Sequence, residues 1–118
     1  MIRVRYDFTA DGGATTNVVQ LAKALEDLVV THVHVVVKTA VTSGGSGTVS
    51  IGTTTDTVKF VGLTDGAVAN LVTGAVLGPT TSENIPYWWK SGDYLIVTVG
   101  TAALLTGVFD VFIEVMKP

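Results

Sequence analysis

The last quarter of the chain holds two runs in which apolar residues recur at every second position. Over residues 108–115, one side of an extended ribbon is wholly apolar and the other is mixed. The first side carries Phe109, Val111, Ile113 and Val115, and the second carries Val108, Asp110, Phe112 and Glu114. Residues 94–99 repeat the alternation, so both runs are predicted to be half-buried strands. Gly100 and Gly107 lie between them, and their backbone freedom favours a hairpin that pairs the two strands.

Similar patterns predict strands in the first half of the chain. Residues 2–8 alternate apolar with polar side chains, which indicates a strand with one wet face, and a turn follows at residues 10–13. Residues 29–41 are dominated by β-branched side chains, which pack well on a pleated surface. At about 3.3 Å per residue such a strand would run roughly 40 Å, so we expect a bend or bulge in it. A glycine-rich turn then returns residues 48–52 as its antiparallel partner, and residues 57–61 are predicted to form another short strand.

Residues 16–28 have a different spacing. Their apolar side chains recur at helical intervals, with polar side chains opposite and Thr16 placed to cap the first turn. These apolar residues are Val18, Leu21, Ala22, Leu25 and Leu28. Periodicity therefore predicts a short helix. Residues 66–78 are too weakly patterned to predict more than short strand pieces and loop, and residues 79–86 are predicted to be a loop before the final hairpin.

Many short strands with turn signals at close intervals indicate an all-β fold. The length of 118 residues suits one domain with one core. We therefore predict a single-domain antiparallel β-sandwich over residues 1–118, with a jelly-roll-like arrangement.

The composition points to contacts with other protein. Only 14% of the residues are charged and 47% are apolar, whereas an ordinary soluble domain has about 25% charged residues. Residues 94–109 lack charge, but they are shorter than the roughly 20 residues of a membrane-spanning helix, so we expect no membrane contact. Residues 1–5 lack the features of a secretory signal. The net charge of −3, with no basic cluster beyond Arg3 and Arg5, argues against nucleic acid. Apolar surface is expected to be buried in a homo-oligomer or a larger assembly.

The sequence has no motif for catalysis or for a cofactor. His32 and His34 share a strand face, but a metal site needs three or four ligands and the chain has no cysteine, so we favour an exposed or hydrogen-bonded strand face. Asp110 and Glu114 lie about 13 Å apart on one strand, beyond the roughly 5 to 9.5 Å of glycosidase carboxylates. We interpret them as solubilising charges. No nucleophile elbow or phosphate-binding loop occurs, and we predict a non-enzymatic protein without cofactor or metal.

The adjacent residues Trp88 and Trp89 point to opposite sides of an extended segment, so at most one of them can lie in the core. The other, beside Tyr87, is either a partner contact or a platform for stacking a sugar, because aromatic side chains offer a large contact area with few rotatable bonds. Local packing of both tryptophans through a bend at Pro86 is a third possibility. The candidate partner interface comprises Tyr87, Trp88, Trp89 and Phe112.

Four segments are informative in combination: Asp11-Gly-Gly-Ala14, residues 38–52, the Thr/Asp stretch 53–56 and residues 98–115. Together they resemble small β-sandwich structural proteins of tailed bacteriophages, which decorate or cement capsids and also occur as head-fibre and tail-fibre modules. The resemblance implies a jelly-roll-like fold, a place on the virion at the capsid surface, and contact with a major capsid protein. It also implies a homo-oligomer, with a trimer favoured over a dimer. It further implies that residues 18–24 form a strand, and on this point we follow the resemblance rather than the periodicity.

The predicted function is therefore that of a capsid decoration or cement subunit that stabilises a bacteriophage head. The alternative is a fibre or adhesin-type module that recognises a host surface glycan through Trp88 or Trp89.

Overall fold

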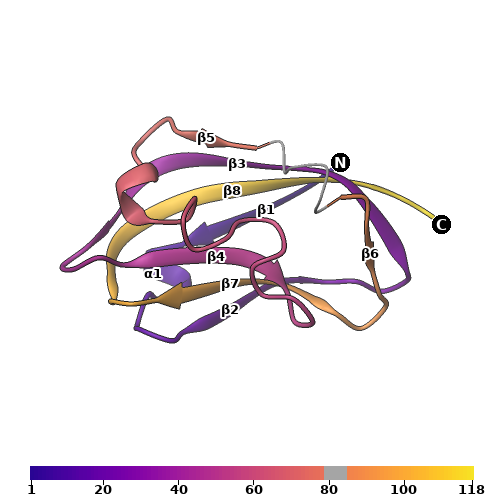
Figure 1. Ribbon diagram of the computed structural model, residues 1–118, viewed down its shortest axis with the longest axis horizontal. Helices are drawn as coiled ribbons and strands as arrows, with labels where there is room; N and C mark the ends of the chain where they lie inside the picture. The colour runs from indigo at the N-terminus through magenta and orange to yellow at the C-terminus, as the bar shows by residue number, and fades with distance from the viewer. Residues whose placement is uncertain (79–84) are drawn as a thin grey trace.

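The computed structural model describes residues 1–78 and 85–118, which form two antiparallel β-sheets packed together (Figure 1). The strands are β1 (Ile2–Asp7), β2 (Val18–Lys23), β3 (Leu28–Ser43), β4 (Thr48–Thr53), β5 (Val76–Leu77), β6 (Tyr87–Trp89), β7 (Tyr94–Gly100) and β8 (Leu104–Met116). Two short helical segments, α1 (Phe8–Asp11) and the 3₁₀ helix η1 (Val68–Asn70), lie in the connections. The predicted all-β antiparallel sandwich is confirmed.

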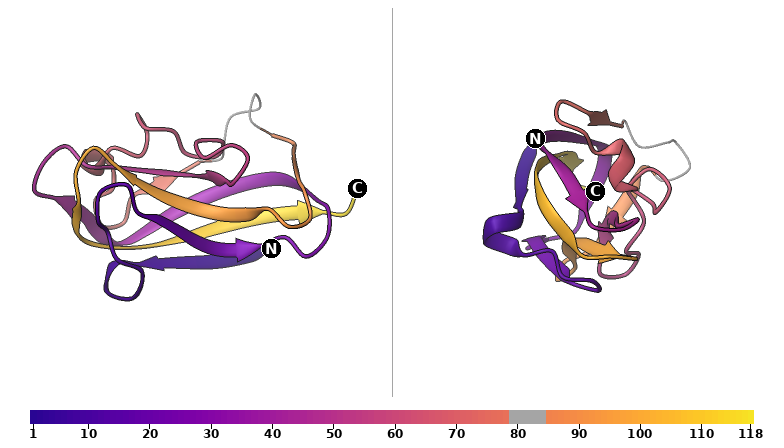
Figure 2. Two further views of the ribbon diagram at one scale, coloured as in Figure 1. Left: turned by 90° about the horizontal axis from the view of Figure 1, so that it is seen from below. Right: turned by 90° about the vertical axis from the view of Figure 1, so that its left-hand side faces the viewer.

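The strands pair in a nested order. One sheet has the order β1-β8-β3-β5 with β6 also paired to β3, and the other has the order β2-β7-β4. The antiparallel pairs β1·β8, β2·β7 and β3·β6 thus lie one inside the next along the chain, as in a long hairpin that has been rolled up (Figure 2). The innermost pair joins β4 to the segment 61–67 through the bridges Ile51↔Val61 and Thr48↔Ala67. This nesting is a jelly-roll arrangement, as predicted.

The predicted hairpin of the last two strands is wrong. Strand β7 pairs with β2 and β4, whereas β8 pairs with β1 and β3 in the other sheet. The connection between them, residues 101–103, therefore crosses from one sheet to the other. Strand β4 likewise pairs with β7 and is not the antiparallel partner of β3. Alternation identifies a strand and its buried side. It does not distinguish a hairpin from a connection between two sheets, because both bury the same side of the strand.

Residues 16–28 contain strand β2, so the helix predicted from their periodicity is wrong and the strand implied by the resemblance is confirmed. The register of β2 against β7 shifts between Gln20 and Ala22, which leaves Leu21 as an extra residue. Two of the residues that gave the helical spacing, Val18 and Leu25, are exposed, so the spacing does not mark one buried face.

The strand predicted at residues 57–61 is also wrong, because this segment is a series of turns that forms a β-bridge to β4 at Val61. The approach to β4 depends on Gly66. The amide of Val49 donates a hydrogen bond of 2.7 Å to the Gly66 carbonyl oxygen, and a Cβ at residue 66 would overlap the carbonyl oxygen of Val49. A side chain here would therefore separate the segment from the strand.

Strands β3 and β1 of the five-stranded sheet lie close to where they were predicted. Strand β3 shows register shifts against β8 at several points along its length, as expected for so long a strand. Strand β1 ends one residue earlier than predicted, at Asp7, because the Asp7 carboxylate accepts a hydrogen bond of 2.9 Å from the amide of Thr9 and caps α1. The predicted turn at residues 10–13 is thus partly helical.

The loop predicted over residues 79–86 lies, up to residue 84, outside the described residues.

The core lies between the sheets. The apolar side of β8 faces it, and Phe109, Val111 and Ile113 are buried as predicted, while Val115 is half-buried. Tyr6 from β1 stacks on Phe109 with ring centroids 4.9 Å apart. The largest fully buried side chains are Trp89, Tyr6, Phe109, Ile51, Leu95 and Ile113.

Candidate partner interface

The two tryptophans of β6 have opposite environments, as predicted. Strand β6 pairs with the start of β3, where Trp89 lies opposite Leu28 and Trp88 lies opposite Val29. Trp89 is 2% exposed, and its indole N–H donates a hydrogen bond of 3.1 Å to the Asp93 carbonyl oxygen. Trp88 points the other way and is 52% exposed. Trp89 is therefore a core residue, whereas Trp88 keeps half of its surface exposed among the described residues.

Tyr87 also faces the core side of the sheet and links the two sheets. Its ring packs edge to face against Phe60, with centroids 5.6 Å apart, and its hydroxyl shares a hydrogen bond of 2.8 Å with the hydroxyl of Thr53 in β4. The ammonium group of Lys59 lies 5.2 Å from the centre of the ring. These contacts give Tyr87 a structural role, so two of the four candidate residues, Tyr87 and Trp89, belong to the interior.

Trp88 belongs to a row of three side chains on the outer face of the five-stranded sheet. Val29 in β3 lies opposite Trp88 on one side and opposite Met116 of β8 on the other. Directly paired residues of antiparallel strands have their side chains on the same face, about 4.5 to 5.5 Å apart at Cβ. Met116 is 56% exposed and Val29 is half-buried. We refer to Trp88, Val29 and Met116 as the apolar row.

Phe112 lies on the same outer face, four residues before Met116 in β8 and hence about 13 Å away along the strand. Its direct neighbours are Arg3 of β1 and His34 of β3. Phe112 itself is half-buried. The structure thus brings Trp88 and Phe112 onto one face and separates them from Tyr87 and Trp89.

Val29, Met116 and Arg3 belong to this face but were not predicted as site residues. Their side of each strand follows from alternation, and this signal was available in the sequence. Their adjacency depends on the register of β1, β3, β6 and β8, which no local pattern contains.

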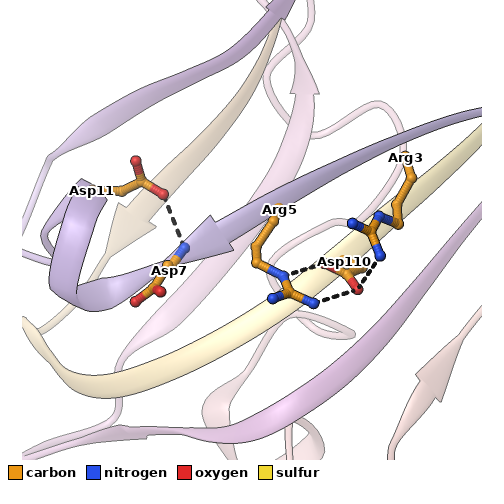
Figure 3. A network of polar contacts seen from close by, with 5 residues as sticks. All are labelled: Arg3, Arg5, Asp7, Asp11 and Asp110. Carbon is orange, nitrogen blue, oxygen red and sulfur yellow. Dashed lines mark hydrogen bonds and ion pairs between the residues drawn. The ribbon is translucent and has the colours of Figure 1, made fainter.

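The interpretation of Asp110 as a solubilising charge is wrong. Its side chain lies on the outer face but has no exposed surface, because guanidinium groups from β1 cover it (Figure 3). Arg5 donates two hydrogen bonds to the carboxylate, of 2.7 Å from Nε and 3.1 Å from Nη2. These hydrogen bonds, with the positive charges of Arg5, Arg3 and Lys38, lower the pKa of Asp110 against the opposing effect of its desolvation.

A second outer-face carboxylate, Glu114, lies against His32, with Nδ1 and Oε2 3.0 Å apart and both side chains about half exposed. His32 and His34 share the outer face, as predicted. Across residues 1–78 and 85–118, no group of three or more His, Cys, Asp or Glu side chains is arranged to hold a metal ion.

Asp7 and Asp11 complete the polar network at the end of β1 (Figure 3). The Asp7 amide donates a hydrogen bond of 2.9 Å to the Asp11 carboxylate, and the Tyr6 hydroxyl donates one to the Gly12 carbonyl oxygen. Burial, with smaller contributions from Asp11 and Asp7, raises the pKa of Tyr6 to about 12. This part of the network holds α1 against β1 and is structural.

Comparisons of the chain with family models, with curated proteins and with solved structures gave no match. None of the helices in the described part of the chain has the length and apolar character needed to cross a membrane. The outer face of the five-stranded sheet is therefore the candidate functional site.

Proposed function

We propose that this protein is a capsid decoration or cement subunit of a bacteriophage, which binds the major capsid protein shell through the outer face of its five-stranded sheet. The observation that carries the proposal is the apolar row with Phe112 nearby, on a regular sheet face that nothing in the described residues covers. Exposed Trp and Arg side chains around apolar neighbours are the types that dominate the binding energy of protein interfaces.

The size of the face supports a stable contact. The molecule measures 42 × 23 × 21 Å along its principal axes. A face of 42 × 23 Å covers at most about 970 Å², which exceeds the roughly 800 Å² that each partner contributes to a standard interface. One face is thus large enough to hold the subunit on the shell. Bridging neighbouring shell subunits would add interface that resists the outward pressure of packaged DNA.

The jelly-roll arrangement supports a virion role, since this architecture is used in viral capsid domains, although lectin domains use it too. The alternative function is therefore recognition of a host glycan stacked on Trp88. The neighbours Val29 and Met116 favour a protein partner, because a sugar would also need convergent polar groups for its hydroxyls. We also propose self-association on the virion, as a trimer or, failing that, a dimer.

The test is co-sedimentation of the purified protein with phage heads that lack it, taken from the phage that encodes the chain. Wild-type protein is expected to sediment with the heads, and Trp88→Ala and Phe112→Ala are expected to weaken binding by about tenfold or more. Leu63→Ala is the matched control, because Leu63 is equally exposed but lies outside the sheets.

Two results would overturn the proposal. One is a wild-type protein that does not sediment with heads. The other is Trp88-dependent binding on a glycan array without binding to heads, which would establish the alternative. Light scattering of the free protein measures the oligomer, and a monomer at high concentration would contradict self-association.

A further inference from the structure

We infer that the outer face accepts a protein surface that presents a carboxylate, and that Arg3, with Lys38 on the far side of β8, receives it. This inference rests on the proposed function, because it concerns the same face. It adds the chemistry of the partner's contacting residues.

Arg3 and Arg5 are two residues apart on β1 but have different partners. Both hydrogen bonds to the Asp110 carboxylate come from Arg5, whose guanidinium is thereby held in place. Arg3 Nη1 lies 3.9 Å from Asp110 Oδ2, which is too far for a hydrogen bond, and the Arg3 side chain is 59% exposed. Within the described residues the Arg3 guanidinium makes no hydrogen bond. Its donors are therefore available to a partner.

Arg3 is placed where a partner would reach it. It lies directly beside Phe112. Lys38 lies on β3, on the other side of β8. It is exposed and comes two residues after Val36, which pairs with Asp110. Figure 3 shows Arg3 and Arg5 converging on Asp110 from the β1 side. Cations thus flank β8 from both neighbouring strands.

Within residues 1–78 and 85–118, the carboxylates of this face already have partners in the protein. Asp110 is enclosed by Arg5, Glu114 pairs with His32, and Asp7 caps α1. The salt bridges found among the described residues leave Lys38 without an ion-pair partner and Arg3 with only its long contact to Asp110. Arg3 and Lys38 are therefore cations without a hydrogen-bonded carboxylate among the described residues, on a chain whose net charge is −3.

A carboxylate suits this site better than a nucleic acid. A guanidinium binds a carboxylate through two parallel hydrogen bonds, which strengthen when the surrounding surface is removed from water. Burial of Trp88 and Phe112 against a protein would do this. Nucleic acid affinity requires many cations along the backbone, and the remainder of this chain would repel phosphates.

The experiment measures binding to heads at 50 to 500 mM salt, with circular dichroism to confirm folding of each variant. Arg3→Gln is expected to weaken binding about tenfold, as for the loss of charge-assisted hydrogen bonds, and to reduce the salt dependence. Lys38→Gln should have a smaller effect in the same direction. Arg3→Lys should restore binding in part, because it keeps the charge but not the paired donors. Lys23→Gln, on the other sheet, is the matched control and should bind as wild type.

A second arm identifies the anion. A poly-glutamate peptide should compete with the heads, and a DNA duplex of equal charge should not; the reverse would overturn the inference. Equal binding by wild type and Arg3→Gln at every salt concentration would overturn it too, while a loss of binding in Trp88→Ala would leave the proposed function standing. If the wild type does not bind heads, both are wrong.

Discussion

The inner and outer faces of the five-stranded sheet are made by the same strands, yet they differ in what covers them. The inner face packs against the three-stranded sheet, and its large side chains, such as Trp89 and Ile113, are fully buried. On the outer face Trp88 and Met116 keep more than half of their surface in solvent. Trp88 and Trp89 are neighbours in the chain, yet Trp89 is part of the core and Trp88 is exposed. Variants on the two faces should therefore report on different properties.

Asp110 does not follow this difference in exposure between the two faces. It lies on the outer face but is as buried as a core residue, because Arg5 and Arg3 from β1 cover it. A residue on the outer face can thus contribute to stability when side chains from a neighbouring strand of the same sheet bury it.

The largest effect is expected from Trp89→Ala, compared with Trp88→Ala. Removal of the buried indole should lower the free energy of unfolding by about 3 to 5 kcal/mol, through lost burial and the cavity left behind. Trp88→Ala should change it by less than about 0.5 kcal/mol, as for other surface positions. Urea denaturation followed by circular dichroism measures both. Similar losses in the two variants would show that Trp88 also supports the fold.

Asp110→Asn tests whether the buried Asp110 carboxylate stabilises the fold through its charge. Because the pKa of Asp110 is lowered in the folded state, its ionised form stabilises the fold above the unfolded pKa, about 3.9, and this contribution is lost as the pH falls through the folded pKa. The variant should be less stable than the wild type at neutral pH, and the difference should shrink below about pH 4. Urea denaturation from pH 3 to 7 provides the curve. A difference that does not change with pH would mean that Asp110 acts through packing alone.

Tyr6→Phe probes the inner face at high pH. The raised pKa of about 12 means that the neutral phenol stabilises the fold below the unfolded pKa and that this contribution is lost as the pH rises toward 12. Absorbance at 295 nm should show a tyrosine that ionises near pH 12 in the wild type and is missing in the variant. Loss of the hydrogen bond to Gly12 should cost about 1 kcal/mol at neutral pH. An unchanged absorbance titration would contradict the assignment.

The smallest effect is expected from His32→Gln on the outer face. An ion pair between half-exposed side chains contributes about 0 to 1 kcal/mol and is screened by salt. The melting temperature of the variant should therefore stay close to that of the wild type. A large drop would mean that the His32 pair with Glu114 resembles the enclosed Asp110 site, and the contrast between Glu114 and Asp110 would be lost.

Local alternation in the sequence was enough to predict several features. It identified β1, β7 and β8, and the core side of β8. It also predicted that Trp88 and Trp89 would face opposite ways. Each of these follows from the two-residue period of an extended chain, which is a property of neighbouring residues.

Only the tertiary structure decided which strands pair, because pairing depends on contacts between segments far apart in the chain. The sequence pattern of β7 and β8 suits a hairpin, yet packing between two sheets placed them in different layers. The apolar spacing of residues 16–28 suits a helix, yet β2 lies within them and pairs with β7. The burial of Asp110 and the position of Arg3 beside Phe112 arise from the register of β1 against β8, across more than 100 residues. Register is set by the packing of the whole sandwich, so no local pattern contains it.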